Sequence, residues 1–145
     1  MSRLSQIAVR IELPVRHGGL GGGVAAVLSE VAGMLDSVVR GGETATIDVR
    51  SLPMSPEDRI ALHAALGNGE VQVTLNAEGV SSLQETGVSG VWWVEHRDRQ
   101  GEVVAELIEV APIPAILRAS SEDMAAGAAE LRARLSMDHI APAGL

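Results

Sequence analysis

The chain has 145 residues, of which 46% are apolar, and a formal net charge of −8. This length predicts a single domain over residues 1–145, with its own hydrophobic core. The acidic balance argues against a nucleic-acid partner, because binding to phosphates needs a cationic surface. All eleven cationic side chains are arginine, and the chain has no cysteine. These absences exclude lysine-based phosphate loops and thiolate-bound metal clusters in this chain.

The remaining composition points to no cofactor or membrane segment. The four histidines are far apart in the sequence, so we expect no bound metal and no cofactor. No uninterrupted apolar run reaches the roughly eighteen residues that a membrane span needs. The apolar stretch from Ile7 to Leu13 contains Arg10 and Glu12, unlike a signal peptide. We therefore expect a cytoplasmic protein without membrane insertion.

The first part of the chain predicts a strand, a helix and a second strand. Apolar and polar residues alternate over residues 5–13, which is typical of a half-buried strand. The glycine cluster at 18–23 does not fit the spacing of a dinucleotide-binding motif, so we interpret it as a linker. Apolar residues over 24–39 recur at helical spacing, and glycines 41–42 end that helix. A short β-branched strand is predicted over 44–49.

A second helix and two further strands follow. Ser55 is a good N-cap, and Pro56 suits the first helical position. Glycines and Asn at 67–69 end this helix. Alternating apolar residues predict a strand over 70–76, and a weaker strand is predicted over 82–86.

The next segment predicts a β-hairpin. Its arms are residues 91–97 and 102–110, and the four residues 98–101, with glycine last, form the turn. In the predicted register, Arg97 faces Glu102, and Trp93 lies opposite Glu106.

The last predicted element is a helix that begins at Ser120 or Ser121. Acidic residues in its first turn and arginines near its end complement the helix dipole. The tail over 137–145 is predicted to be frayed. The helix is expected to bury a stripe of apolar residues, namely Met124, Ala128, Leu131 and Leu135.

Taken together, the element order predicts an α+β fold. Consecutive strands joined by short turns imply an antiparallel, mainly meander sheet. We expect about three helices to pack on one of its faces.

Trp92 and Trp93 are the only aromatic residues apart from the histidines. Neighbouring side chains on a strand point to opposite faces, so one indole is expected in the core and the other outside it. An exposed indole would be an anchor for another protein. Alternatively, this chain covers both faces of the strand, as large aromatic side chains are mostly buried.

Several strings between residues 47 and 117 resemble the C-terminal region of the HupH/HyaF hydrogenase expression proteins. The resemblance covers about residues 44–135 and depends on the combination and order of the strings. The strings are Ile47–Arg59 (IDVRSLPMSPEDR), Ala65–Val71 (ALGNGEV), Glu85–His96 (ETGVSGVWWVEH), Glu106–Val110 (ELIEV) and Ile113–Leu117 (IPAIL).

The resemblance implies a non-enzymatic accessory protein, or chaperone, for the maturation of an uptake nickel–iron hydrogenase. Its implied partners are the precursor of the iron–sulfur small subunit or other maturation proteins, and a homodimer is left open. The alternative is a small-molecule or metal-dependent enzyme that uses the Trp–His–Glu region. Under the first hypothesis, replacing an exposed Trp by Ala should weaken binding by roughly 2 kcal/mol while the fold persists. The candidate partner-binding residues are Trp92, Trp93, His96, Glu85, Glu106 and Glu109.

Overall fold

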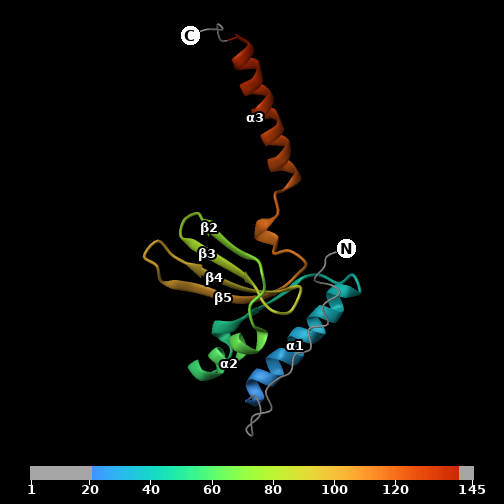
Figure 1. Ribbon diagram of the computed structural model, residues 1–145, viewed down its shortest axis with the longest axis vertical. Helices are drawn as coiled ribbons and strands as arrows, with labels where there is room; N and C mark the ends of the chain where they lie inside the picture. The colour runs from blue at the N-terminus through green and yellow to red at the C-terminus, as the bar shows by residue number, and fades with distance from the viewer. Residues whose placement is uncertain (1–20, 141–145) are drawn as a thin grey trace. The chain divides into compact units, whose positions relative to one another are not determined.

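A computed structural model describes residues 21–140 (Figure 1). The predicted strand over 5–13 and residues 18–20 of the glycine cluster lie outside the described residues, as does the chain after residue 140. The rest of the cluster is not a linker, because Gly21 is the N-cap of the first helix and Gly22 and Gly23 belong to it. The described residues divide into two compact units, one ending at Pro114 and the other beginning at Ala115. The elements are α1 (Gly22–Val39), β1 (Ala45–Asp48), η2 (Val49–Ser51), α2 (Pro56–Leu66), β2 (Gln72–Asn76), β3 (Val80–Glu85), β4 (Val91–Arg97), β5 (Val103–Val110), η3 (Ala115–Leu117) and α3 (Ser121–Ile140).

The first unit contains a five-stranded antiparallel sheet with the order β1-β5-β4-β3-β2. Strands β2 to β5 form a meander, and β1 joins it beside β5. The α+β class and the meander sheet are therefore confirmed.

Helices α1 and α2 lie on one face of this sheet (Figure 1). Val24, Val27 and Val31 from α1 enter the same core as Leu62 and Leu66 from α2. The strands contribute β-branched residues and one indole to that core, which suits a pleated, buried surface. These strand residues are Ile47, Val91, Trp93, Ile108 and Val110.

The ends of the first two helices follow local sequence chemistry. The side chain of Ser55 accepts a hydrogen bond from the Asp58 N–H at 3.1 Å, so the predicted N-cap of α2 is confirmed. Gly67 ends α2 with a φ of 70°, and Gly41 follows α1 with a φ of 86°. A residue with a Cβ atom rarely adopts this conformation, which explains why both helices stop at glycine.

The β4–β5 hairpin forms as predicted, but its register differs. Gly101 closes the turn through its N–H, which donates to the Asp98 carbonyl at 3.0 Å. A β-bulge between His96 and Arg97 then shifts the ladder. The predicted pairs are wrong, and the observed pairs are Trp93 with Ile108, Glu95 with Glu106 and Arg97 with Val103.

The predicted Arg97–Glu102 ion pair is replaced by one within β4. The Arg97 guanidinium lies 2.7 Å from the Glu95 carboxylate. Residues two apart on a strand share a face, so this pair does not depend on the register of the hairpin.

By length and composition alone, α1 could also cross a membrane. It contains Glu30 and Asp36, and its buried valines pack in the core of the first unit. Those valines make up the 17% of the helix that is buried, so most of α1 is exposed.

The second unit contains η3 and α3. The Ser120 side chain accepts a hydrogen bond from the Asp123 N–H at 3.0 Å, so Ser120 is the residue that caps α3. The helix continues to Ile140, beyond the predicted start of fraying at residue 137. Within the second unit the predicted stripe is not buried, because Met124, Leu131 and Leu135 are 57–61% exposed. Helical spacing marks the stripe but does not show what covers it.

Candidate functional site

The face of the sheet opposite α1 and α2 carries most of the candidate residues. We call it the second face. Because side chains alternate across a strand, the register assigns each residue to one face. The second face consists of three cross-strand rows.

The middle row of the second face is apolar. Val73, Leu83, Val94 and Leu107 lie side by side on β2, β3, β4 and β5. Leu83 and Val94 are buried, whereas Val73 and Leu107 are half-buried. The row therefore offers apolar surface mainly at its two ends.

A second row places an indole between two carboxylates. Trp92 lies opposite Glu85 on one side and opposite Glu109 on the other. Its ring is only 6% exposed, and its Nε1–H donates to the Ala111 carbonyl at 3.2 Å. Burial with a satisfied N–H is the usual environment of a structural tryptophan.

Trp93 lies on the opposite face, in the core with α1 and α2. It is 9% exposed, and its ring meets the His63 ring of α2 edge-on, with 4.5 Å between centroids. The expectation that one indole would be exposed is therefore wrong. The strand alternation places the two rings on opposite faces, but both faces are covered at this position.

The third row contains a hydrogen-bonded polar pair. Ser81 Oγ lies 2.6 Å from His96 Nδ1, across β3 and β4, and both residues are half-buried. Leu75 and Ala105 flank this pair on β2 and β5.

The structure thus separates the six predicted partner-binding residues. Four lie on the second face, whereas Glu106 lies with Trp93 on the helix-covered side, opposite Glu95. The four on the second face are Trp92, His96, Glu85 and Glu109.

Glu85 also has a structural task. Its Oε2 accepts hydrogen bonds from the N–H groups of Glu70 and Val71, at 3.2 and 3.3 Å. The Gly69 N–H donates to the Glu85 carbonyl at 2.7 Å. A Cβ on Gly69 would lie 2.6 Å from the Thr86 carbonyl oxygen, so only glycine fits there. These contacts join two of the strings on which the family resemblance depends.

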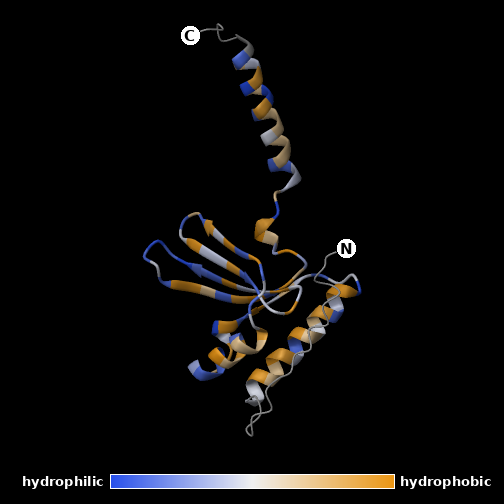
Figure 2. Ribbon diagram, viewed as in Figure 1, coloured by the Kyte–Doolittle hydropathy of each residue, from blue (hydrophilic) through white to orange (hydrophobic). Residues whose placement is uncertain are grey.

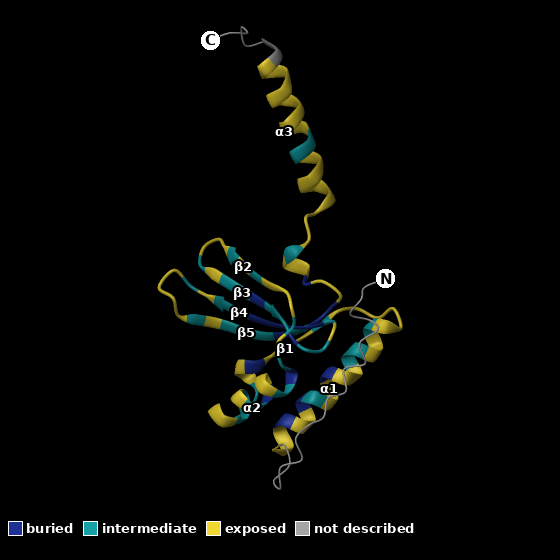
Figure 3. Ribbon diagram, in the orientation of Figure 1, coloured by how far each residue is buried: buried dark blue, intermediate teal, exposed yellow. Residues whose placement is uncertain are grey.

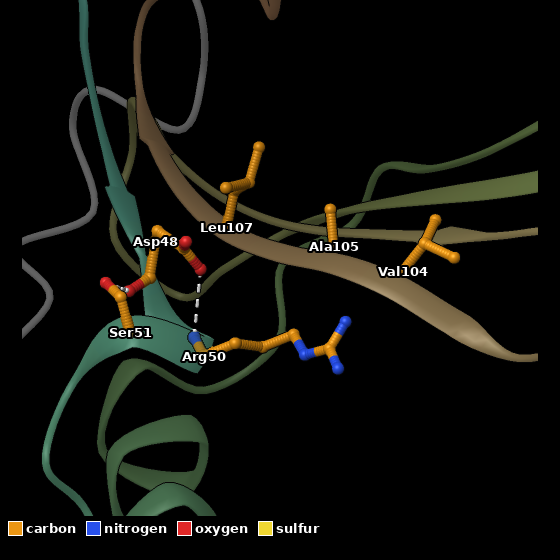
Figure 4. Close-up of a pocket in the computed structure, with 6 residues that line it drawn as sticks. All are labelled: Asp48, Arg50, Ser51, Val104, Ala105 and Leu107. Carbon is orange, nitrogen blue, oxygen red and sulfur yellow. Dashed lines mark hydrogen bonds between the residues drawn. The ribbon is translucent and has the colours of Figure 1, made fainter.

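A hollow of about 410 Å³ opens where β1 ends beside β5. Figure 4 shows Val104, Ala105 and Leu107 along one side of β5, with Arg50 reaching out from η2. One Arg50 nitrogen donates to the Val103 carbonyl at 2.9 Å, and the Arg50 backbone N–H donates to the Asp48 carboxylate at 3.0 Å. The hollow therefore continues from the apolar middle row, at Leu107, toward the polar side chains of Asp48, Arg50 and Ser51.

Sequence reasoning missed the apolar row and the hollow. The alternation over 70–76 correctly groups Val73 with Leu75, but it does not identify the face that they share. The hollow depends on β1 being shorter than β5, which only the pairing of the two strands shows.

The arrangement suits binding better than acid–base chemistry. Within residues 21–140, the structure brings together no group of three or more His, Asp or Glu side chains suited to a metal ion. Glu85 and Glu109 instead place carboxylates on either side of Trp92, close to half-buried apolar side chains. Such a mixed surface is typical of a protein-binding face.

Comparison with known proteins identifies relatives of most of the chain. Residues 23–137 match the family model described as "HupH hydrogenase expression protein, C-terminal conserved region". The hydrogenase expression/formation protein HupH of Rhizobium leguminosarum bv. viciae is 33% identical over 121 residues, which cover 81% of this chain and 43% of that protein. The hydrogenase-1 operon protein HyaF of Escherichia coli (strain K12) is 31% identical over 86 residues, which cover 59% of this chain and 30% of that protein.

A solved structure shares the fold. It is the hydrogenase expression protein HupH from Thiobacillus denitrificans ATCC 25259, with 42% sequence identity and a TM-score of 0.76. The match covers 80% of this chain and 97% of the solved chain. By contrast, the matched region spans less than half the length of these two curated relatives.

Proposed function

Because this chain belongs to the HupH hydrogenase expression protein family, we propose that it is an accessory protein for the maturation of an uptake nickel–iron hydrogenase. In this proposal it acts in the cytoplasm, binds the precursor of the iron–sulfur small subunit and catalyses no reaction. Family membership is the observation that carries the proposal, since the relatives are named as hydrogenase expression or formation proteins.

The chemistry of the chain supports a binding role. Without cysteine, this chain has no thiolate with which to carry an iron–sulfur cluster. Its contribution to a cluster-containing subunit is therefore to hold polypeptide.

We assign the binding to the second face. Val73, Leu75 and Leu107 supply half-buried apolar contacts there, and the negative charge of Glu85 and Glu109 favours a target segment that carries arginine or lysine. The buried Trp92 acts beneath this surface as a support, replacing the exposed anchor of the sequence hypothesis.

Affinity isolation from cells that make the hydrogenase tests the proposed function. The tagged full chain should retain the small-subunit precursor, identified by mass spectrometry. Retention of other maturation proteins without the precursor would overturn the choice of target, and retention of no hydrogenase-related protein would overturn the function itself.

A further inference from the structure

The sheet of the first unit has two edges, and one of them carries features that hinder pairing with a further strand. Strand β1 forms that edge, has four residues and ends in Asp48. Where β5 continues beyond β1, the Arg50 side chain donates to the Val103 carbonyl at 2.9 Å, and the bulge between β4 and β5 lies at the same end. Short strands, charged side chains and bulges are the means by which proteins protect sheet edges.

The opposite edge, β2, lacks these features. Its five residues carry no charge and no proline, and its pairing with β3 is regular. Within the described residues, no strand pairs with the outer side of β2, which ends the strand order. Figure 3 shows β2 at the margin of the sheet, and exposed and half-buried residues alternate along it. An unprotected edge of this kind is a template for strand addition.

The hydrogen bonds beside β2 show which main-chain groups face the open edge. The Glu85 N–H donates to the Val71 carbonyl at 2.8 Å, so Val71 bonds to the β3 side. Main-chain groups of an antiparallel strand point to alternate sides, so those of Val73 and Leu75 also face β3. The main-chain N–H and C=O groups of the other three residues of β2 face away from β3. These residues are Gln72, Thr74 and Asn76.

An added strand would also extend the second face. Val73 and Leu75 are half-buried on that face, and Val71, two residues before Val73, is 43% exposed. Apolar and polar residues alternate along β2 (Figure 2). Apolar side chains at every second position of an added strand would pack beside these three residues, while its main chain bonds to the edge. The geometry therefore favours an extended segment with alternating apolar residues.

Carboxylates at both ends of β2 select the charge of that segment. Glu70 precedes the strand, Glu78 follows it, and both are exposed. Arg99 lies 3.9 Å from Glu78, but the two side chains are 73% and 92% exposed, and such a pair contributes little. If a second copy paired with β2 about a two-fold axis at Thr74, each Glu70 would lie opposite a Glu78, and facing like charges destabilise a strand pair. Arginine or lysine near the ends of an added segment would instead be attracted.

We propose that β2 binds an extended segment of the target as an added edge strand, with alternating apolar residues and with basic residues near both ends. Main-chain hydrogen bonds to β2 would hold the segment, and its apolar side chains would continue the second face. This inference rests on the proposed binding role of the chain, but it does not depend on which protein is the target.

Amide hydrogen exchange of the full chain, followed residue by residue by NMR, tests whether the edge is open. In the free chain, Val73 and Leu75 should exchange at least about tenfold more slowly than Gln72 and Thr74, because only the first two donate to β3. Slow exchange at Thr74 at every protein concentration would mean that another part of this chain covers β2. Protection of Thr74 that grows with protein concentration would mean that a second copy covers it. Either result would overturn the proposal.

A synthetic peptide in which valine and threonine alternate between two pairs of arginines probes the chemistry of the partner. It should slow exchange at Thr74 by about tenfold or more, and the same peptide with glutamates in place of the arginines should bind at least about tenfold more weakly. Absence of protection by the arginine peptide, or equal binding of the two peptides, would overturn the inference. The assay contains no hydrogenase protein, so its failure is distinct from failure of the small-subunit precursor to bind, which would count against the proposed function.

Thr74→Pro separates the open edge from the ladder between β2 and β3. Proline removes the outward N–H of residue 74 and leaves the bonds of Val73 and Leu75 to β3 in place, so the folded variant should bind the arginine peptide about tenfold more weakly or worse. Thr74→Val is the matched control, because it keeps the N–H and a β-branched side chain, and it should bind within about threefold of the wild type. If Thr74→Pro does not fold, Thr74→Lys gives the same test by placing a repelling charge on the edge. A folded Thr74→Pro or Thr74→Lys chain that binds like the wild type would overturn strand addition at β2.

Discussion

At the scale of single residues, the tryptophan pair shows how much a sequence pattern determines. Alternation on a strand correctly places Trp92 and Trp93 on opposite faces. It does not determine whether each face is covered, because burial depends on residues far away in the chain. Trp92 is buried with its N–H bonded to Ala111, and Trp93 is buried against His63.

Both indoles should therefore support the fold. Trp93→Ala is expected to lower the free energy of unfolding by about 3–5 kcal/mol, the usual effect of removing a large buried aromatic ring. Trp92→Phe should lower it by about 1–3 kcal/mol, because the buried Ala111 carbonyl loses its donor. Urea unfolding followed by circular dichroism measures both values. Wild-type stability of Trp93→Ala would contradict the buried position of that ring.

Gly69 and Gly33 differ in the space around their Cβ positions, so replacing each by alanine should have opposite effects on stability. Gly69→Ala should destabilise the protein, since the new Cβ would lie 2.6 Å from the Thr86 carbonyl oxygen. Gly33→Ala, in the middle of α1 with no atom within 4 Å of its Cβ position, should stabilise it by about 0.5–1 kcal/mol. Thermal unfolding of the two variants checks the contrast. Shifts of the same sign would mean that crowding at Gly69 is not the determining factor.

At the scale of elements, local chemistry predicted where helices and turns begin and end. Ser55 and Ser120 cap their helices, and Gly67 and Gly101 adopt the positive φ that their positions require. The hairpin register was not predictable in the same way. The Asp98 N–H bonds to the Glu102 carbonyl, which places Arg97 opposite Val103, and the bulge between His96 and Arg97 then shifts every pair beyond it. The stripe on α3 was recognised, but its burial was not.

The cap of α2 offers a direct test of this local control. Ser55→Ala should lower the free energy of unfolding by about 1 kcal/mol, because the Asp58 N–H loses its side-chain acceptor. Ser29→Ala, at an exposed position within α1, should change it by less than about 0.5 kcal/mol. Chemical denaturation of both variants gives the comparison, and equal effects would argue against a specific capping role.

At the scale of the whole molecule, the described chain has two units with different means of stabilisation. The sheet and two helices share a continuous core, whereas α3 exposes its apolar stripe. The family resemblance came mainly from strings in the first unit, two of which meet at Gly69 and Glu85. Sequence strings could identify the family, but only the strand pairing reveals the second face and its neighbouring hollow.

Amide hydrogen exchange should separate the two units. In dilute solution, amides of α3 are expected to exchange faster than those of β4, because an isolated helix of this length opens readily. Protection of α3 as strong as that of β4 would contradict this difference between the two units.

The most direct test of the central claim is a binding titration of the purified small-subunit precursor with two variants of β2. Leu75 and Thr74 are neighbours in the sequence, but Leu75 lies on the second face and Thr74 on the other. Leu75→Glu should weaken binding by roughly tenfold or more, because a charge would replace an apolar contact in the interface, whereas Thr74→Glu should bind like the wild type. Unchanged affinity for Leu75→Glu, with both variants folded, would contradict binding through the second face.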